Sequence, residues 1–298
     1  MARQGEVPMT ARQGVVRGSR AFAAMVIVAT LLSHQGAARS ATSQGPRERD
    51  QFASVNGIRL HYVDWGGTGT PMLFLGGGGN GGAHTFDSFA PRFTDHFEVL
   101  GLTRRGGGLS DKPPSSYDTN TLATDIAGFL DALHISRAIL VGHSLAGAEM
   151  TRFAGTYPNR VRALVYLDAV VDYVRIAEIS AEAGFNGQGF DETPQVKAIQ
   201  AGAAQSHPDY TKVTAPALAF IETCGAPPQA RPEDDQAYKR YLQLLYEKGV
   251  WWESIKQFRA EMKHGTIIEL PDCNHFFFKD PQQAERAERE MRTFLSRP

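Results

Sequence analysis

The chain has 298 residues, with 31 Lys and Arg against 32 Asp and Glu, so its formal net charge is -1. A hydrophobic content of 42% and a charged content of 21% are ordinary for a globular protein and argue against wholesale disorder. The balanced charge, without a long basic run, argues against a nucleic-acid-binding protein, whose affinity depends on clustered Lys and Arg.

Residues 1–40 have the layout of a secretory signal peptide. Arginines precede an apolar run over residues 21–32, and small residues follow it. The run is too short for a transmembrane helix, which needs about 20 apolar residues. We therefore expect export to a secreted or periplasmic location, cleavage after Ala38 or Ser40, and no membrane span after cleavage. An uncleaved anchor, or a start misplaced upstream of a cytosolic protein, is the alternative.

After the leader, strand patterns alternate with helical patterns. The first two strands flank Asn56-Gly57, which is a strong hairpin signal. Strands are predicted at residues 52–55, 58–65, 72–75, 97–102, 138–141, 163–167, 217–221 and 266–270. Helices are predicted at residues 121–134, 146–157 and 282–295, with one long helical stretch over 233–262. This order predicts a mostly parallel sheet with helices on both faces and the hairpin as an antiparallel edge.

Residues 170–214 interrupt this alternation. They are rich in Ala, Gly and Gln, are helical in places and contain no strong strand pattern. We interpret them as a lid inserted over the carboxyl end of the sheet.

The sequence Gly142-His143-Ser144-Leu145-Ala146-Gly147 lies between a predicted strand and a predicted helix. A turn this tight needs small flanking residues, and it raises the serine hydroxyl above the sheet. The following helix points free N–H groups towards developing negative charge. The pattern predicts Ser144 as a nucleophile; the alternative is a glycine-rich turn with an idle serine.

With these residues in view, the chain from about residue 52 to residue 298 resembles the α/β-hydrolase family, in its serine-nucleophile, esterase-like branch. The resemblance rests on the turn at 142–147, on the segment 105–113 and on Asn274-His275-Phe276 after the last strand. It implies an α/β-hydrolase fold with a mostly parallel eight-stranded sheet and a small helical lid. It also implies a catalytic triad in the order serine, acid, histidine.

The resemblance implies that His275 is the general base, because the family places its histidine after the last strand. The family most often places the acid a few residues after the last strand but one, here the predicted strand 217–221. Residues 222–228, which follow that strand, contain no Asp. A minority pattern has the acid one strand earlier, where Asp168 fits. The alternative role for Asp168 is to cap the amino terminus of the helix that follows it. Other carboxylates stay open as the acid: Glu222 first, then Asp172, Asp234 and Asp235.

Two backbone amides are needed to hold an oxyanion. The resemblance implies Leu145, which follows the nucleophile, and Gly78, with Gly79 as the next choice. Gly76 stands where the family usually has a histidine. In the same family the neighbouring Arg104 and Arg105 belong to a structural turn.

Cys224 and Cys273 are the two cysteines of the chain. The resemblance implies that the strands preceding them are neighbours, so an exported protein is expected to join them in a disulfide. Two free, buried thiols are the alternative. Neither His-x-x-x-His nor His-Glu-x-x-His occurs, so no metal site is predicted from the sequence.

These features together predict an exported serine hydrolase that cleaves a carboxylic ester or lactone of small to medium size through an acyl-enzyme. It would need no cofactor and would bind a small-molecule ester rather than nucleic acid. Peptidase, perhydrolase and hydroxynitrile-lyase activities also use a serine of this kind. A non-catalytic binding protein on the same scaffold is an alternative of another class.

Overall fold

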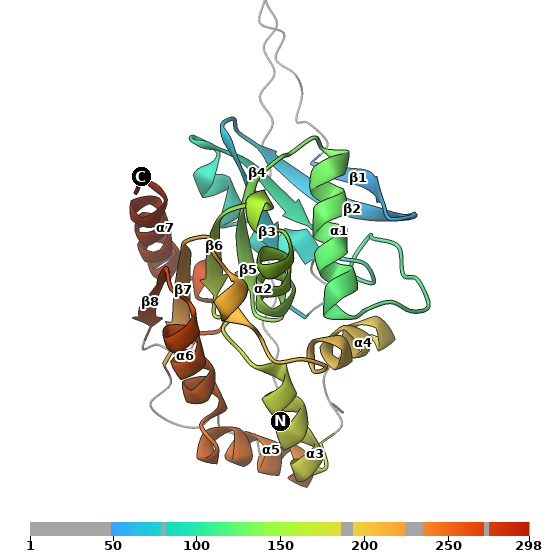
Figure 1. Ribbon diagram of the computed structural model, residues 1–298, viewed down its shortest axis with the longest axis vertical. Coiled ribbons are helices and arrows are strands. Elements are labelled where there is room, and N and C mark those ends of the chain that lie inside the picture. Colours follow the sequence, from blue (N-terminus) through green and yellow to red (C-terminus); the bar gives the residue numbers. More distant parts are fainter. Residues whose placement is uncertain (1–48, 79–81, 186–192, 224–234, 271–273, 298) are drawn as a thin grey trace, which may run out of the picture. The chain divides into compact units, whose positions relative to one another are not determined.

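The computed structural model describes residues 49–78, 82–185, 193–223, 235–270 and 274–297 (Figure 1). The predicted signal peptide, Gly79, Asp234 and both cysteines lie outside these ranges, so the predictions for them stay predictions. Within the described ranges, no helix has the length and apolar character needed to span a membrane.

The centre of the fold is an eight-stranded sheet in the order β1-β2-β4-β3-β5-β6-β7-β8. The pairs β1–β2 and β2–β4 are antiparallel, and the remaining neighbours are parallel. This confirms the predicted fold class. The strands are β1 (Asp50–Val55), β2 (Ile58–Gly66), β3 (Thr70–Leu75), β4 (Phe97–Leu102), β5 (Ala138–His143), β6 (Val161–Leu167), β7 (Ala217–Glu222) and β8 (Gly265–Leu270).

The antiparallel edge is a hairpin, as Asn56-Gly57 predicts. Both residues have positive φ, 48° for Asn56 and 79° for Gly57, and Val55 pairs directly with Ile58. A two-residue turn of this kind matches the twist of the two strands, and Asn and Gly adopt it at low cost.

Side chains of the central strands alternate between two apolar layers. In β3, Leu73 and Leu75 belong to one buried cluster, whereas Met72 and Phe74 belong to the other. This period of two is the geometry of an extended strand, and burial on both faces explains why the strand sequence is apolar throughout.

Helices cover both faces of the sheet. The first layer packs under α1 (Thr119–Ala132), α2 (Ala146–Thr156) and α6 (Val250–Glu261), and the second packs under α7 (Pro281–Leu295). Figure 1 shows α1 and α2 in front of the strands and α7 beside β8. Short 3-10 helices complete the fold: η1 (Gly82–Phe86), η2 (Ala90–Phe93), η3 (Pro158–Arg160), η4 (Tyr210–Lys212) and η5 (Phe277–Lys279).

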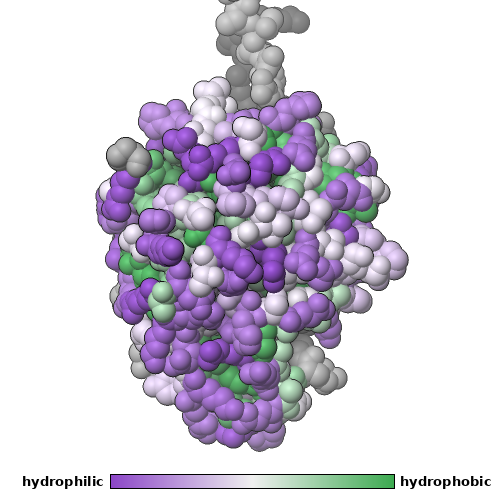
Figure 2. Space-filling view, in the orientation of Figure 1, coloured by the Kyte–Doolittle hydropathy of each residue, from purple (hydrophilic) through white to green (hydrophobic). Residues whose placement is uncertain are grey.

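Beyond the carboxyl ends of the strands lie further helices. The chain between β6 and β7 forms α3 (Tyr173–Ala183) and α4 (Pro194–Ala203), and α5 (Gln236–Glu247) follows β7. Ile179 of α3 is buried against Leu242 and Leu245 of α5. The helices beyond the carboxyl ends of the strands therefore come from two segments of the chain, one before β7 and one after it. The visible surface is mainly hydrophilic, with apolar residues showing at the end where α3 and α5 lie (Figure 2).

The prediction of one long helical stretch over 233–262 is wrong. The chain forms α5 and α6 instead, separated at Lys248 and Gly249, because Gly249 adopts the left-handed conformation with φ of 56°. A glycine reaches this conformation without a steric penalty, and an α-helix commonly ends where it occurs.

The strands before the two cysteines are parallel neighbours, paired as far as Glu222 and Leu270. The Thr223 amide also donates to the Leu270 carbonyl at 2.8 Å. This adjacency is what the predicted disulfide between Cys224 and Cys273 requires, and the disulfide itself stays a prediction.

Candidate active site

Ser144 lies in a strained turn between β5 and α2. Its φ is 54°, in the left-handed region that residues other than glycine rarely adopt. The turn needs small neighbours: a Cβ on Gly142 would lie 3.2 Å from Met150 Sδ, and one on Gly147 would lie 1.9 Å from the Ala169 carbonyl oxygen. Strain of this kind persists only where packing enforces it, and it is common at active sites.

Asp168 and His275 meet although 107 residues separate them. The Asp168 carboxylate, directly after β6, lies 2.6 Å from His275 Nδ1. The Asp168 amide donates to the Phe220 carbonyl at 2.9 Å, which ties this residue to β7. A carboxylate at Nδ1 holds the proton on that nitrogen and leaves Nε2 as the basic one.

The other candidate acids have different partners. Glu222 accepts a hydrogen bond from the Asn274 amide at 2.6 Å, so it holds the main chain of the His275 loop rather than the imidazole. Asp172 accepts from the Val174 amide and caps α3, and Asp235 accepts from the Tyr238 amide and caps α5. Among the described carboxylates, the hydrogen bonds favour Asp168 as the partner of His275.

His143 supports the same loop from beneath. It is buried, its ring lies 4.4 Å from that of His275, and its Nε2 lies 2.9 Å from the His275 carbonyl oxygen. Burial lowers the pKa of His143 to about 3, with the charge of His275 as a further cause. His143 is therefore neutral at working pH and donates its Nε2–H to that carbonyl.

Arg104 and Arg105 have structural roles. Arg105 makes a bidentate ion pair with Asp125, at 2.5 and 2.7 Å. Arg104 pairs with buried Glu149 at 2.8 Å and also donates to the carbonyls of Gly76 and Gly77. The buried pair thus holds the glycine loop that is predicted to bind the oxyanion.

The two predicted oxyanion donors lie side by side. A Cβ on Gly78 would be 3.5 Å from Leu145 Cδ2, and a Cβ on Gly77 would be 3.1 Å from Ser144 Cβ. Among the described residues, neither the Gly78 nor the Leu145 amide donates to a main-chain carbonyl outside helices and strands. The two amides are thus close to the serine, and their role stays a prediction.

Tyr173, the first residue of α3, has a contact that the sequence did not indicate. Burial raises the pKa of Tyr173 well above its ordinary value, and the nearby Ser144 hydroxyl opposes this rise. The tyrosine is therefore protonated at working pH. Among the described residues, the Ser144 hydroxyl has no hydrogen bond to His275 in this state; catalytic hydrogen bonds often tighten only when substrate binds.

We expect Tyr173→Phe to lower kcat on an accepted substrate by about fivefold, because the Tyr173 hydroxyl lies near Ser144 and one neutral hydrogen bond formed there during the reaction would contribute about 1 kcal/mol. Steady-state kinetics test this, with Tyr246→Phe as the control, since Tyr246 is an exposed tyrosine of α5. A loss of several thousandfold would instead place the Tyr173 hydroxyl in the chemical step.

Known proteins share this fold and part of this sequence. Residues 70–213 match the family model described as alpha/beta hydrolase fold. The crystal structure of E-2-(acetamidomethylene)succinate hydrolase superposes with a TM-score of 0.61 at 22% identity, covering 83% of this chain and 99% of that one. Residues 70–213 therefore have an α/β-hydrolase sequence, and the chain has the α/β-hydrolase fold.

Curated relatives of the chain carry several activities. The 2-(acetamidomethylene)succinate hydrolase of Mesorhizobium japonicum is 35% identical over 48% of the chain and 51% of the relative. The bifunctional esterase/perhydrolase DCH of Acinetobacter calcoaceticus is 28% identical over 46% of the chain and 50% of the relative. The chain spans about half the length of the curated relatives it matches.

Proposed function

We propose that this α/β-hydrolase is an exported serine hydrolase that cleaves a small to medium carboxylic ester or lactone through an acyl-enzyme. The observation that carries the proposal is the 2.6 Å contact between Asp168 and His275 Nδ1. Ser144, held at positive φ, lies near this contact, because its amide donates to the carbonyl of Leu167, the residue before Asp168, at 3.3 Å.

In the proposed mechanism, Ser144 Oγ attacks the substrate carbonyl while His275 Nε2 accepts the serine proton. Asp168 keeps the imidazole oriented and stabilises the imidazolium that forms. The Leu145 and Gly78 amides hold the oxyanion of the tetrahedral intermediate. His275 then donates the proton to the leaving alcohol, and a water activated by the same imidazole hydrolyses the acyl-enzyme.

The names of the relatives support testing substrates other than esters. One is named for a substrate with an acetamido group, and another is named as both esterase and perhydrolase. A serine acyl-enzyme can form from an ester or an amide, and the acyl group can pass to water or to peroxide. Amide cleavage and perhydrolysis are therefore the candidate activities to compare with ester cleavage.

The experiment is a substrate panel on the purified protein, beginning with p-nitrophenyl esters of increasing chain length. N-acyl amides with matched acyl groups, and acetate with peroxide, form the other two arms. We expect ester turnover, with covalent incorporation of a fluorophosphonate at Ser144 seen as a mass increase of the intact chain. Absence of both turnover and labelling would contradict the proposal and favour a binding protein. Labelling with turnover only of amides would correct the bond type.

A further inference from the structure

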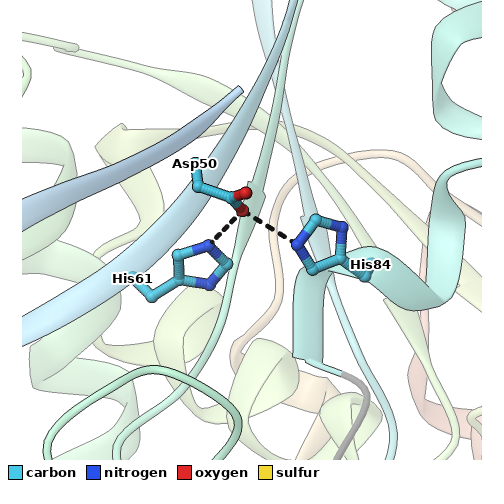
Figure 3. A group of neighbouring side chains, drawn as sticks. All are labelled: Asp50, His61 and His84. Atoms are coloured by element: carbon cyan, nitrogen blue, oxygen red, sulfur yellow. Dashed lines mark hydrogen bonds and ion pairs between the residues drawn. The ribbon is translucent and has the colours of Figure 1, made fainter. Parts of the chain in front are cut away.

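A second cluster of side chains lies outside the proposed active site, where the first two strands meet η1. Asp50 begins β1, His61 lies in β2 and His84 lies in η1. One carboxylate oxygen of Asp50 is 2.7 Å from His61 Nε2 and 2.8 Å from His84 Nε2. Figure 3 shows the carboxylate between the two imidazole rings, with a nitrogen of each ring directed towards it.

We propose that Asp50, His61 and His84 form a binding site for one divalent transition-metal ion of the Zn²⁺ type. Their three ligand atoms all lie within 4.8 Å of one another. Metal–ligand bonds of about 2.0–2.2 Å in a tetrahedral arrangement place ligand atoms about 3.4 Å apart, so the Asp50 oxygen must move away from the two nitrogens by roughly 0.6 Å. The two histidine nitrogens, which lie within 4.8 Å of each other, must also move closer together by up to about 1.4 Å, and the His84 side chain can move because it is 44% exposed. Asp50 can move because its side chain is 42% exposed.

The donor set identifies the class of ion. Two imidazole nitrogens and one carboxylate oxygen suit Zn²⁺ and neighbouring transition metals, whereas Ca²⁺ and Mg²⁺ prefer oxygen ligands. The His84 side chain is 44% exposed, so water can reach the site and supply a fourth ligand.

The other nitrogen of each imidazole already has a partner. His84 Nδ1 lies 2.9 Å from an oxygen of Asp87, and the second oxygen of Asp87 accepts from Trp65 Nε1 at 3.0 Å. A carboxylate at Nδ1 keeps the proton there and frees Nε2 for a metal. This carboxylate–histidine–metal arrangement is the usual environment of a metal-binding histidine.

Hydrogen bonds inside the fold also fix the orientation of the His61 ring. It is buried, and its Nδ1 is hydrogen-bonded to Thr103 Oγ1 at 2.9 Å; this hydroxyl is fixed in turn by the Ala83 amide, which donates to it at 3.0 Å. The His61 amide donates to Ser110 Oγ at 2.9 Å. The ring therefore keeps its Nε2 directed at Asp50, so little ordering is needed when an ion binds.

The site connects elements that are distant in the sequence. An ion there would join the β1–β2 hairpin to η1, which begins at Gly82, soon after the glycine loop that includes Gly78. Metal binding to the folded state raises stability by mass action, so we expect a melting temperature that increases with metal concentration. The sequence alone predicts no metal site, because the ligands come from three elements and form no local motif.

The test uses the untagged protein, stripped with a chelator and dialysed. Calorimetric titration with ZnCl₂ is expected to show one saturable ion per chain, and Co²⁺ is expected to give the strong visible absorption of a four-coordinate site. His84→Ala and Asp50→Asn should each weaken Zn²⁺ binding at least 100-fold. Asp87→Asn should weaken it by about 10–100-fold, as expected for a residue that orients a metal ligand.

His96→Ala is the matched control, because His96 is also an exposed histidine beside an aspartate, with its Nε2 3.6 Å from Asp95. Its affinity for Zn²⁺ should equal that of the unmodified protein. The proposal is overturned if the stripped protein shows no saturable binding, which would leave the cluster as an ion-pair network. It is also overturned if His84→Ala and Asp50→Asn bind Zn²⁺ as tightly as the unmodified chain, which would assign the ion to other groups such as the two cysteines.

Discussion

Replacement of Ser144 by alanine is expected to lower kcat on an accepted ester by about a million-fold, the scale seen when the serine of a triad is removed. The reason is that Ser144 has the only side-chain hydroxyl in the turn between β5 and α2, next to the Leu145 amide that is predicted to hold the oxyanion. The measurement is steady-state hydrolysis of the best p-nitrophenyl ester, with fluorophosphonate labelling of both proteins. Residual activity within tenfold of the original enzyme would rule out Ser144 as the nucleophile.

Ser144→Gly separates the chemistry from the strain. Glycine adopts the observed φ of 54° without the steric cost that a side chain brings. We therefore expect this variant to be as inactive as Ser144→Ala but more stable than it by about 1 kcal/mol, a typical cost of a strained backbone residue. Urea denaturation monitored by fluorescence gives the comparison. Equal stability of the Ala and Gly variants would mean that the turn stores little strain.

Asp168→Asn is expected to lower kcat by about 10⁴-fold with little change in KM, as when the triad acid of another serine hydrolase becomes an amide. The amide cannot stabilise the imidazolium and favours the wrong imidazole tautomer. Asn also tolerates the φ of 47° found at this position, so the backbone should not change.

Glu222→Gln is the matched comparison for Asp168→Asn. Glutamine keeps an oxygen that can accept from the Asn274 amide, so we expect a loss of at most tenfold. Circular dichroism and thermal melting of both variants show whether either change disturbs the fold. If Glu222→Gln proves to be the severe variant and Asp168→Asn the mild one, the acid has been assigned to the wrong strand.

Most of the fold could be predicted from local sequence patterns. All eight strands and their mostly parallel order follow from short apolar runs separated by helical periodicity. The hairpin follows from two adjacent residues that accept positive φ. The break between α5 and α6 was missed, because a single glycine inside a helical pattern signals either a tolerated residue or a helix end, and packing decides between them.

The candidate site also has one part that local sequence predicts and one part that it does not. The position of Ser144 follows from the sequence by itself. The patterns of a strand, of a tight turn with small residues and of a helix all lie within a few residues of it in the chain. The partner of His275 could not be chosen in this way, since Asp168 and Glu222 both end neighbouring strands. Their different contacts exist only once β6, β7 and the His275 loop are assembled.

Tyr173 and the Asp50–His61–His84 cluster belong wholly to the tertiary structure. The tyrosine reaches Ser144 only because α3 folds back over the carboxyl ends of the strands. The two histidines share one carboxylate only because the hairpin and η1 converge on Thr103. Local sequence determines most of the elements and the turn that holds Ser144. Contacts between residues far apart in the chain decide which side chains can act together, because they depend on how the elements pack.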